Sequence, residues 1–284
     1  MILEETIKKA SIVLKRGLIN SHALDAQLIL SNIMGVSKEF ILLNPDIKIS
    51  EKTRKKYYEH INRRLKKEPV AYITGKKEFW SQDFLLNRST LIPRPETELI
   101  IYKVIKLFKN KKINILDIGV GSGCILLSIL KELKYAKGIG IDIAPKAIKK
   151  SMENSKRLSL ANRSKFKVFD IEKFNHGKYD LIVSNPPYVP LKDIKNLSKD
   201  ILNYEPLIAL KGGFDGLDLI KKVIYKSKYL LKRNGLLIVE IGHKQYIEVS
   251  DIFKKHGFRL IDKVYDNNRN VRCIIITNAW FKLL

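Results

Sequence analysis

The chain has 284 residues, of which 45% are hydrophobic and 29% charged. This suits one large core plus a smaller domain, and it excludes an intrinsically disordered chain. No stretch approaches the roughly 18 to 20 apolar residues of a membrane span, and the first residues carry no signal-peptide core, so we expect a cytoplasmic protein without a membrane partner. The net charge of +25 is spread over every segment, which indicates a lysine-rich surface and disfavours a dedicated nucleic-acid site.

Cysteine and histidine usage argues against a metal centre. The two cysteines, Cys124 and Cys273, are too few for a thiolate site or a disulfide framework, and the five histidines lack ligand spacing. We therefore expect no metal. Nothing in the sequence indicates an oligomer, so a monomer is the default expectation.

The first part of the chain predicts a small helical domain. Apolar residues recur at three- and four-residue spacings over 2–30, and a basic helix with one apolar face is expected over 50–67. Residues 77–91 then alternate between apolar and polar side chains, which predicts a hairpin. We expect an all-α domain over 1–75, a β-hairpin linker over 76–92 and a second domain over 93–284.

The second domain predicts a strand, a glycine-rich loop and a helix near its start. The apolar run at 112–118 is followed by Gly119, Val120, Gly121, Ser122 and Gly123. That arrangement brings backbone N–H groups and a helix N-terminus close to a ligand. A second strand, about twenty residues on, ends at Asp142, whose carboxylate is placed to accept both hydroxyls of a ribose. Together the two features indicate a cofactor that contains adenosine.

The chemistry of the loop then selects among such cofactors. A Walker loop needs a Gly-Lys-Ser/Thr sequence, which is absent from this loop. The glycines also do not have the Gly-x-Gly-x-x-Gly spacing that is typical of NAD-binding loops. Asp117 adds a carboxylate at the loop mouth, where it would repel a pyrophosphate and suit a ligand that carries an ammonium and a sulfonium group. The loop therefore favours S-adenosylmethionine over NAD or ATP.

The remaining elements predict an open α/β sheet. Strands are expected at 138–142, 165–169, 180–184, 235–241, 258–265 and 271–277, helices at 96–108, 145–158, 216–232 and 244–256, and an irregular segment at 189–214. Alternating strands and helices with two final strands predict a Rossmann-like, mostly parallel sheet of about seven strands that ends in an antiparallel hairpin.

The loop after the strand at 180–184 is a second candidate site. Asn185, Pro186, Pro187 and Tyr188 follow that strand, and the two prolines keep the chain stiff at the sheet edge where α/β proteins bind ligands. The carbonyls of the Asn185 side chain and the Pro186 peptide can converge on the two hydrogens of one amino or amide nitrogen. Tyr188 offers a flat face for stacking. A Pro-rich turn with a capping Asn is the alternative interpretation of this motif alone.

Several separated segments together resemble one enzyme family. They are 68–75, Glu78-Phe79-Trp80, 91–98, 117–123, Asp142, 185–188, Glu205-Pro206 and 213–218. In this combination the chain resembles the class I S-adenosylmethionine-dependent methyltransferases that methylate the side-chain amide of a glutamine in peptide chain release factors. The resemblance covers nearly the whole chain.

The resemblance implies how the cofactor would be held. The loop from Gly119 to Gly123, with Asp117 at its start, would face the methionine and ribose parts, Asp142 would accept the ribose hydroxyls, and Asp170 with Ile171 would meet the adenine edge. Asn185 would also contact the cofactor, in addition to the substrate. Two residues depart from the family pattern. Val120 stands where a small polar residue is usual, and Ile171 where an aromatic residue is frequent, and either change would loosen cofactor binding.

The resemblance also implies how the substrate would be held. Asn185, Pro186, Pro187 and Tyr188 would hold the glutamine side chain, with the catalytic contacts at Asn185, Pro186 and Tyr188. Arg94 and Glu96 would lie near the pocket mouth. The helical domain at 1–75 would dock the release factor.

The chemistry of amide methylation agrees with this assignment. Acceptors at Asn185 and Pro186 would favour a pyramidal, more nucleophilic nitrogen, and positioning alone can supply on the order of 7 to 11 kcal/mol. We expect neither a covalent intermediate nor a dedicated side-chain base. Two other substrates remain open, a glutamine in a ribosomal protein and the exocyclic amine of a DNA or RNA base. A non-catalytic cofactor-binding module is disfavoured because the loop and both carboxylate positions are intact.

Overall fold

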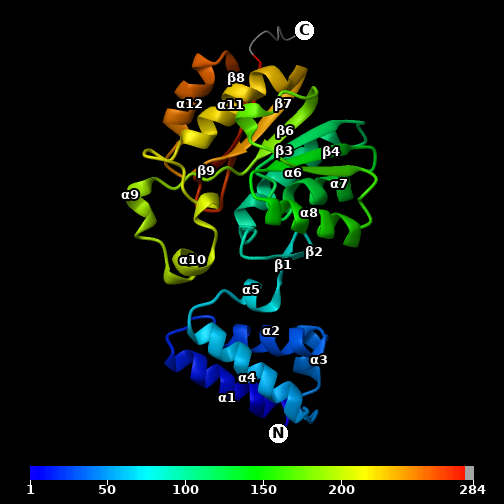
Figure 1. Ribbon diagram of the computed structural model, residues 1–284, viewed down its shortest axis with the longest axis vertical. Coiled ribbons are helices and arrows are strands. Elements are labelled where there is room, and N and C mark those ends of the chain that lie inside the picture. Colours follow the sequence, from blue (N-terminus) through cyan, green and yellow to red (C-terminus); the bar gives the residue numbers. More distant parts are fainter. Residues whose placement is uncertain (279–284) are drawn as a thin grey trace. The chain divides into compact units, whose positions relative to one another are not determined.

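The computed structural model describes residues 1–278 and comprises two compact units (Figure 1). The first unit contains Met1–Lys76 and Ser198–Tyr204, and the second contains Lys77–Leu197 and residues 205–278. Within the described residues, every helix is too short or too polar to cross a lipid bilayer.

The helical unit is built from helices that each bury one apolar face. Its helices are α1 (Leu3–Arg16), α2 (His22–Met34), α3 (Lys38–Leu43), α4 (Glu51–Leu65), α5 (Val70–Thr74) and α10 (Lys199–Tyr204). The side chains of Ser37 and Ser50 cap α3 and α4 by accepting backbone N–H groups. Tyr57 is fully buried among the apolar side chains and donates its hydroxyl hydrogen to the carbonyl of Ala26.

A segment distant in sequence completes the helical unit. Arg64 is largely buried, and it donates through Nε to Asp25 Oδ2 at 2.7 Å and through Nη1 to Asp200 Oδ2 at 2.9 Å. The Tyr204 hydroxyl donates to the carbonyl of Lys66 at 2.8 Å. The prediction of an irregular segment over 189–214 is therefore wrong in part. The helix α10 forms there with partners that no local pattern reveals.

A short hairpin follows α5. Strands β1 (Lys76–Phe79) and β2 (Gln82–Leu85) form a two-stranded sheet. Trp80 and Ser81 both have positive φ, 49° and 54°, as the two central residues of a type I′ hairpin turn must. The hairpin is shorter than the sequence predicted, because the chain turns again at Asn87, whose carbonyl accepts the N–H of Thr90.

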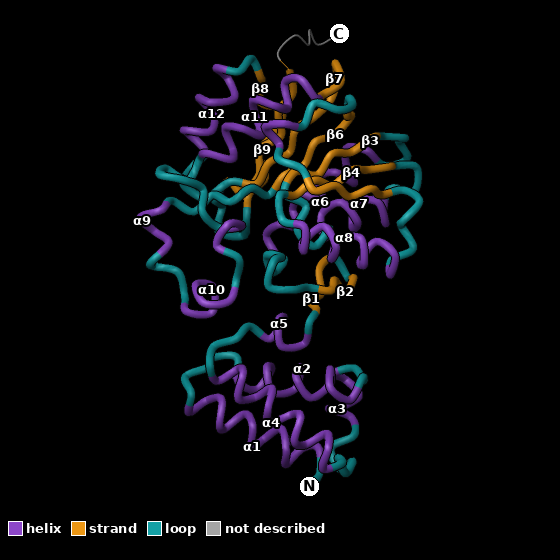
Figure 2. Tube along the Cα trace, in the orientation of Figure 1, coloured by secondary structure: helices purple, strands orange, loops and turns teal. Residues whose placement is uncertain are grey.

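The second unit is a seven-stranded sheet with helices on both faces (Figure 2). Its strands are β3 (Asn114–Ile118), β4 (Lys137–Asp142), β5 (Ser164–Val168), β6 (Tyr179–Ser184), β7 (Leu231–Glu240), β8 (Phe258–Tyr265) and β9 (Val271–Asn278). They lie in the order β5-β4-β3-β6-β7-β9-β8. Pairing is parallel from β5 to β7, and β9 runs antiparallel to both β7 and β8. The predicted Rossmann-like sheet with its C-terminal antiparallel hairpin is confirmed.

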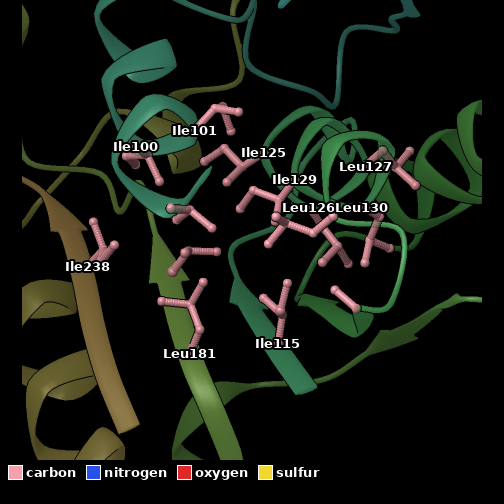
Figure 3. Close-up of a cluster of buried hydrophobic side chains, with 14 of the residues drawn as sticks. Ile100, Ile101, Ile115, Ile125, Leu126, Leu127, Ile129, Leu130, Leu181 and Ile238 are labelled. Atoms are coloured by element: carbon pink, nitrogen blue, oxygen red, sulfur yellow. The ribbon is translucent and has the colours of Figure 1, made fainter. Parts of the chain in front are cut away.

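The alternation of side chains along the strands explains the two helical layers. The helices of this unit are α6 (Glu98–Phe108), α7 (Cys124–Glu132), α8 (Pro145–Arg157), α9 (Leu191–Ile194), α11 (Asp218–Leu230) and α12 (Tyr246–Lys255), with 3-10 turns at Pro95–Thr97, Ile171–Lys173 and Leu207–Ala209. Ile115, Leu181 and Ile238 pack against α6 and α7 (Figure 3). Their chain neighbours Leu116 and Ile182 join the opposite cluster, with α11 and α12. Successive side chains of a strand point to opposite faces, so strands covered on both sides are continuous apolar runs.

The order of the strands places a crevice at the end of β3. From β3 the chain adds β4 and β5 on one side and then returns to add β6 and β7 on the other. In open α/β sheets, ligands bind outside the carboxyl ends of the strands at such a reversal. The glycine loop follows β3, Asp142 ends β4 and Asn185 follows β6. The three candidate segments therefore meet at one edge of the sheet.

Candidate active site

A cavity of about 250 Å³ lies at the carboxyl ends of β3, β4, β5 and β6, within the second unit. The predicted site residues that line it are Arg94, Gly119, Val120, Gly121, Ser122, Asp142, Asp170, Ile171, Asn185 and Pro187. Other predicted site residues lie outside its lining, namely Glu96, Asp117, Gly123, Pro186 and Tyr188. One cavity thus joins the glycine loop, the end of β4 and the proline loop.

In the loop after β3, the backbone at Gly119 and Gly121 lines the cavity without a side chain to cover it. Gly119 and Gly121 have φ of 76° and 55°, in the left-handed region that favours glycine. A Cβ added at Gly119 would meet no heavy atom within 4 Å, so the space beside this residue is open. Gly123 has a different role, because a Cβ there would come within 3.0 Å of Leu127 Cδ1 and 3.1 Å of Ser151 Cβ. Gly123 therefore allows α7 to pack closely on α8.

Asp142 ends β4 and contacts the glycine loop. Its Oδ2 accepts the N–H of Gly121 and its Oδ1 accepts the N–H of Ala144, each at 2.9 Å. Burial raises the pKa of this carboxyl, and the two N–H groups offset part of that effect. A carboxylate oxygen can accept more than one hydrogen bond. Asp142 can therefore hold the loop and still accept hydroxyl groups from a ligand.

Asp117 lies beneath the loop. It is fully buried, its Oδ2 accepts the N–H of Leu126 at 3.2 Å, and its Oδ1 has no hydrogen-bond partner within residues 1–278. Burial raises the pKa of this carboxyl to about 8. Asp117 is two residues from Ile115 and so shares the face of β3 that α7 covers. Its expected position at the loop mouth is therefore wrong, and the carboxyl instead supports the first turn of α7.

The end of the cavity beyond β5 is lined by Phe169, Asp170 and Ile171. Asp170 caps a 3-10 turn by accepting the N–H of Glu172 at 2.9 Å. The Phe169 ring packs edge-on against Phe174, with 5.4 Å between ring centroids. The family pattern places an aromatic residue at the position of Ile171. Here an aromatic ring reaches the cavity from two residues earlier in the chain.

The hydrogen bonds of Asn185 determine which side of its amide group is free. Its Nδ2 donates to Thr97 Oγ1 at 3.0 Å, and Thr97 donates its hydroxyl hydrogen to Glu240 Oε2 at 2.7 Å. Neither Asn185 Oδ1 nor the Pro186 carbonyl oxygen accepts a hydrogen bond from any residue that the structure describes. Both acceptors that the sequence singled out are thus without a hydrogen bond from the described residues, and of the two residues Asn185 lines the cavity.

Tyr188 belongs to a buried polar network behind the proline loop. Its hydroxyl donates to Glu240 Oε1 at 3.4 Å and accepts from Arg272 Nη2 at 3.2 Å. The Arg272 guanidinium lies 5.7 Å from the centre of the Tyr188 ring. Burial raises the pKa of Glu240 to about 6, and the Thr97 hydroxyl and Arg272 lower it in part. Arg272 therefore lies beside the Tyr188 ring, and the hydroxyl of Tyr188 anchors the loop in this network. The stacking of Tyr188 on a substrate stays a prediction.

Arg94 reaches the cavity from the segment before α6. Its Nη2 donates to Glu205 Oε1 at 2.6 Å, and Glu205 Oε2 accepts the N–H of Ile92 at 3.3 Å. The Glu205 side chain is almost fully buried. This ion pair fixes the segment that forms one wall of the cavity. Glu96, by contrast, is exposed.

Sequence reasoning missed Thr97, Phe169, Lys222 and Glu240. Phe169 and Lys222 line the cavity, and Lys222 pairs with Glu172 at 2.6 Å. Glu240 carried a usable signal, because it ends a buried strand just as Asp142 does. Thr97 carried none, because its partners Asn185 and Glu240 lie 88 and 143 residues away along the chain.

Comparisons with known proteins identify the family. The PrmC N-terminal domain model matches residues 5–75, and a methyltransferase domain model matches residues 109–281. The release factor glutamine methyltransferase of Clostridium acetobutylicum is 37% identical, over 97% of this chain and 98% of its own. That of Buchnera aphidicola subsp. Schizaphis graminum is 38% identical, over 87% of this chain and 90% of its own.

Among solved structures, the ribosomal protein L11 methylase from Lactobacillus delbrueckii subsp. bulgaricus aligns with 68% of this chain and 83% of its own, at a TM-score of 0.50 and 17% identity. That likeness concerns the fold alone. The sequence relatives extend over both units and carry the assignment. The chain therefore belongs to the release factor glutamine methyltransferase family.

Proposed function

We propose that this chain transfers the methyl group of S-adenosylmethionine to the side-chain amide nitrogen, N5, of a glutamine in a peptide chain release factor. The observation that carries the proposal is the pair of acceptors without hydrogen-bond partners in the described chain, Asn185 Oδ1 and the Pro186 carbonyl, on a loop whose residues Asn185 and Pro187 line the same cavity as the glycine loop. Family membership supports it, since relatives that match nearly the whole chain are named for glutamine methylation of release factors.

The cavity has the features that S-adenosylmethionine requires. The bare backbone at Gly119 and Gly121 leaves room for the methionine part, and the Asp142 carboxylate would accept the ribose hydroxyls. Phe169 and Ile171 offer apolar surface to the adenine. When bound, S-adenosylmethionine supplies a methyl group on a positively charged sulfur.

The residues of the proline loop would prepare the substrate nitrogen. Asn185 Oδ1 and the Pro186 carbonyl each accept one hydrogen of the glutamine NH₂ group, which fixes the nitrogen and favours the pyramidal geometry in which its lone pair can react. The two prolines keep these oxygens in place without a conformational search. No dedicated base is required, because a protonated amide is a strong acid and loses its proton to water.

The same cavity contains a thiol that must not compete for the methyl group. Cys124 lines the cavity, and burial raises the pKa of its thiol to about 12. A thiol held neutral is a poor nucleophile, because the thiolate is the reactive form. Cys124 would therefore remain unmethylated while the substrate amide reacts.

The helical domain over 1–75, with 76–92 as its connection to the methyltransferase domain over 93–284, would dock the release factor. Leu43 and Leu18 are 80% and 82% exposed and are the side chains of this domain that we assign to contact with the release factor. We expect Leu43→Ser to raise KM for the release factor with little change in kcat. Ile247→Ser, at a site 72% exposed in the second unit, is the matched control. An equal effect of both variants would contradict docking by this domain.

The protein would act as a monomer in the cytoplasm, without direct nucleic-acid binding. The direct test offers S-adenosylmethionine with a labelled methyl group to a release factor, a ribosomal protein and RNA side by side. The proposal predicts label in the release factor, lost when its acceptor glutamine is replaced by alanine. Label in the ribosomal protein or in RNA would move the assignment to that substrate.

A further inference from the structure

We infer that Thr97 and Glu240 are positioning residues that set the orientation of the Asn185 amide, and that they thereby make the site select an amide NH₂ group over a carboxylate. The inference rests on the proposed function, because it concerns the same acceptor atoms. It goes beyond that function by assigning substrate specificity to two residues outside the proline loop.

The number of hydrogens that Thr97 and Glu240 can donate fixes the direction of the hydrogen bonds between them and Asn185. A threonine hydroxyl has one hydrogen to donate, and an ionised carboxylate can only accept. The Thr97 hydroxyl donates its single hydrogen to Glu240 Oε2 at 2.7 Å, so it can only accept a hydrogen bond from Asn185. The Asn185 group 3.0 Å away must then be the NH₂ group. Asn185 Oδ1 is consequently on the opposite side of the amide, and Asn185 lines the cavity.

Glu240 is held as an acceptor by its surroundings. The charged and titratable groups that face it are Arg272 on β9, with Nη2 at 3.6 Å from Oε1, Tyr188 after β6, with its hydroxyl at 3.4 Å, Glu96 next to Thr97, and Cys273, the residue opposite Glu240 in the pairing of β7 with β9. Arg272 and the Tyr188 hydroxyl both present hydrogens to Oε1. Burial raises the pKa of Glu240 to about 6, which leaves the carboxylate ionised at neutral pH.

The orientation decides what the site can bind. With Oδ1 free, the site offers two oxygens, which attract an NH₂ group and repel a carboxylate. With the amide reversed, it would offer an NH₂ group beside the Pro186 carbonyl, and this NH₂ group would donate to a carboxylate oxygen. Glutamine and glutamate have the same shape, so shape alone cannot separate them.

Glu240→Gln is the variant that should reverse the amide. The introduced glutamine would turn its carbonyl toward the donors Arg272 and Tyr188 and its NH₂ group toward Thr97. Thr97 would then accept from this NH₂ group and donate to Asn185, whose Oδ1 would have to face Thr97. We expect kcat on the glutamine form of the release factor to fall roughly 100-fold. We also expect the glutamate form to bind at least about tenfold more tightly than it binds to wild type.

Thr97 variants test whether the effect of Glu240 reaches Asn185 through the Thr97 hydroxyl. Thr97→Ser keeps the hydroxyl and should retain kcat and the preference for glutamine. Thr97→Val removes the hydroxyl and should lower both kcat and this preference. The matched control is Thr277→Val. Like Thr97, Thr277 is a buried threonine whose hydroxyl donates a hydrogen bond, in this case to the carbonyl oxygen of Gly235. In the double variant Glu240→Gln with Thr97→Val, the effect of Glu240→Gln should largely vanish, since it acts through the hydroxyl.

The experiment measures three quantities for each variant: kcat on the glutamine form, affinity for the glutamate form by calorimetry without turnover, and the pH profile of kcat. For wild type, kcat should fall as the pH drops below about 6, where Glu240 gains a proton and can donate to Thr97. For Glu240→Gln this step should be absent. A merely structural role would change neither the pH profile nor the choice between glutamine and glutamate.

The outcomes separate this inference from the proposed function. If wild type transfers no methyl group to the release factor glutamine, the proposed function fails. If wild type is active but Glu240→Gln and Thr97→Val keep its kcat and its preference for glutamine, the positioning role is refuted and the proposed function stands. Equal losses in Thr97→Ser and Thr97→Val would also refute it, because they would show that packing and not the hydroxyl matters.

Discussion

Asp142→Asn perturbs the cofactor end of the cavity in a way whose size follows from two hydrogen bonds. Asp142 accepts the N–H of Gly121 through one oxygen and the N–H of Ala144 through the other, each at 2.9 Å. An asparagine has the same shape but only one oxygen, so one of these N–H groups would face an NH₂ group. Leaving a buried donor without its acceptor costs roughly 1–3 kcal/mol.

The same substitution should weaken the cofactor. A hydrogen bond to a charged group contributes roughly 1.5–3 kcal/mol, so loss of one bond to the ribose predicts affinity for S-adenosylmethionine lower by roughly 10- to 150-fold. Calorimetric titration measures that affinity, and urea denaturation followed by circular dichroism measures the free energy of unfolding. Asp251→Asn, at an exposed position on α12, removes the same charge and should change the free energy of unfolding by less than about 0.5 kcal/mol.

One result would refute the reasoning. If Asp142→Asn bound S-adenosylmethionine within about twofold of wild type while the fold was intact, Asp142 would not contact the cofactor. A loss of stability without a loss of affinity would restrict its role to holding the glycine loop.

Other changes test the supporting structure. Burial raises the pKa of Asp117 to about 8 from an ordinary 3.8, so the folded chain holds this proton more tightly than the unfolded chain, and the resulting stability is lost as the pH rises toward 8. As the pH rises from about 5 to about 8, the free energy of unfolding of Asp117→Asn should therefore fall less than that of wild type. Equal slopes of unfolding free energy against pH, measured by denaturation, would contradict this. Arg64→Met leaves the buried Asp25 with the Ser21 hydroxyl but without its ion-pair partner, and it should destabilise the helical unit by roughly 3–5 kcal/mol, measured by hydrogen exchange of α2 and α4, where unchanged protection is the contrary result. Phe169→Ala should lower affinity for S-adenosylmethionine roughly tenfold, and an unchanged dissociation constant in calorimetry would remove Phe169 from the adenine end.

Much of the second unit could be predicted from the sequence because its central strands are buried on both faces. Such strands are uninterrupted apolar runs, and the polar residues that follow them fall at the carboxyl edge where the sheet reverses direction. The glycine loop, Asp142 and Asn185 were found in this way, and one cavity brings them together. The free oxygens at Asn185 and Pro186 were deduced from the composition of the loop alone.

The parts that were missed depend on partners distant in the chain. α10 forms in the helical unit because Asp200 reaches Arg64, 136 residues away. Thr97 resembled an ordinary residue at a helix entrance until Asn185 and Glu240 were placed beside it. Asp117 was misplaced for a local reason, since its two-residue spacing from Ile115 already indicated the face under α7.

The central claim is that Asn185 acts on the substrate nitrogen and not on the cofactor. Single-turnover methyl transfer by Asn185→Ala to a release factor, at saturating S-adenosylmethionine, tests it most directly. We predict a rate roughly 100- to 1,000-fold below wild type together with a cofactor dissociation constant that stays close to the wild-type value. A rate near that of wild type would contradict the role assigned to Asn185 and with it the proposed geometry of amide methylation.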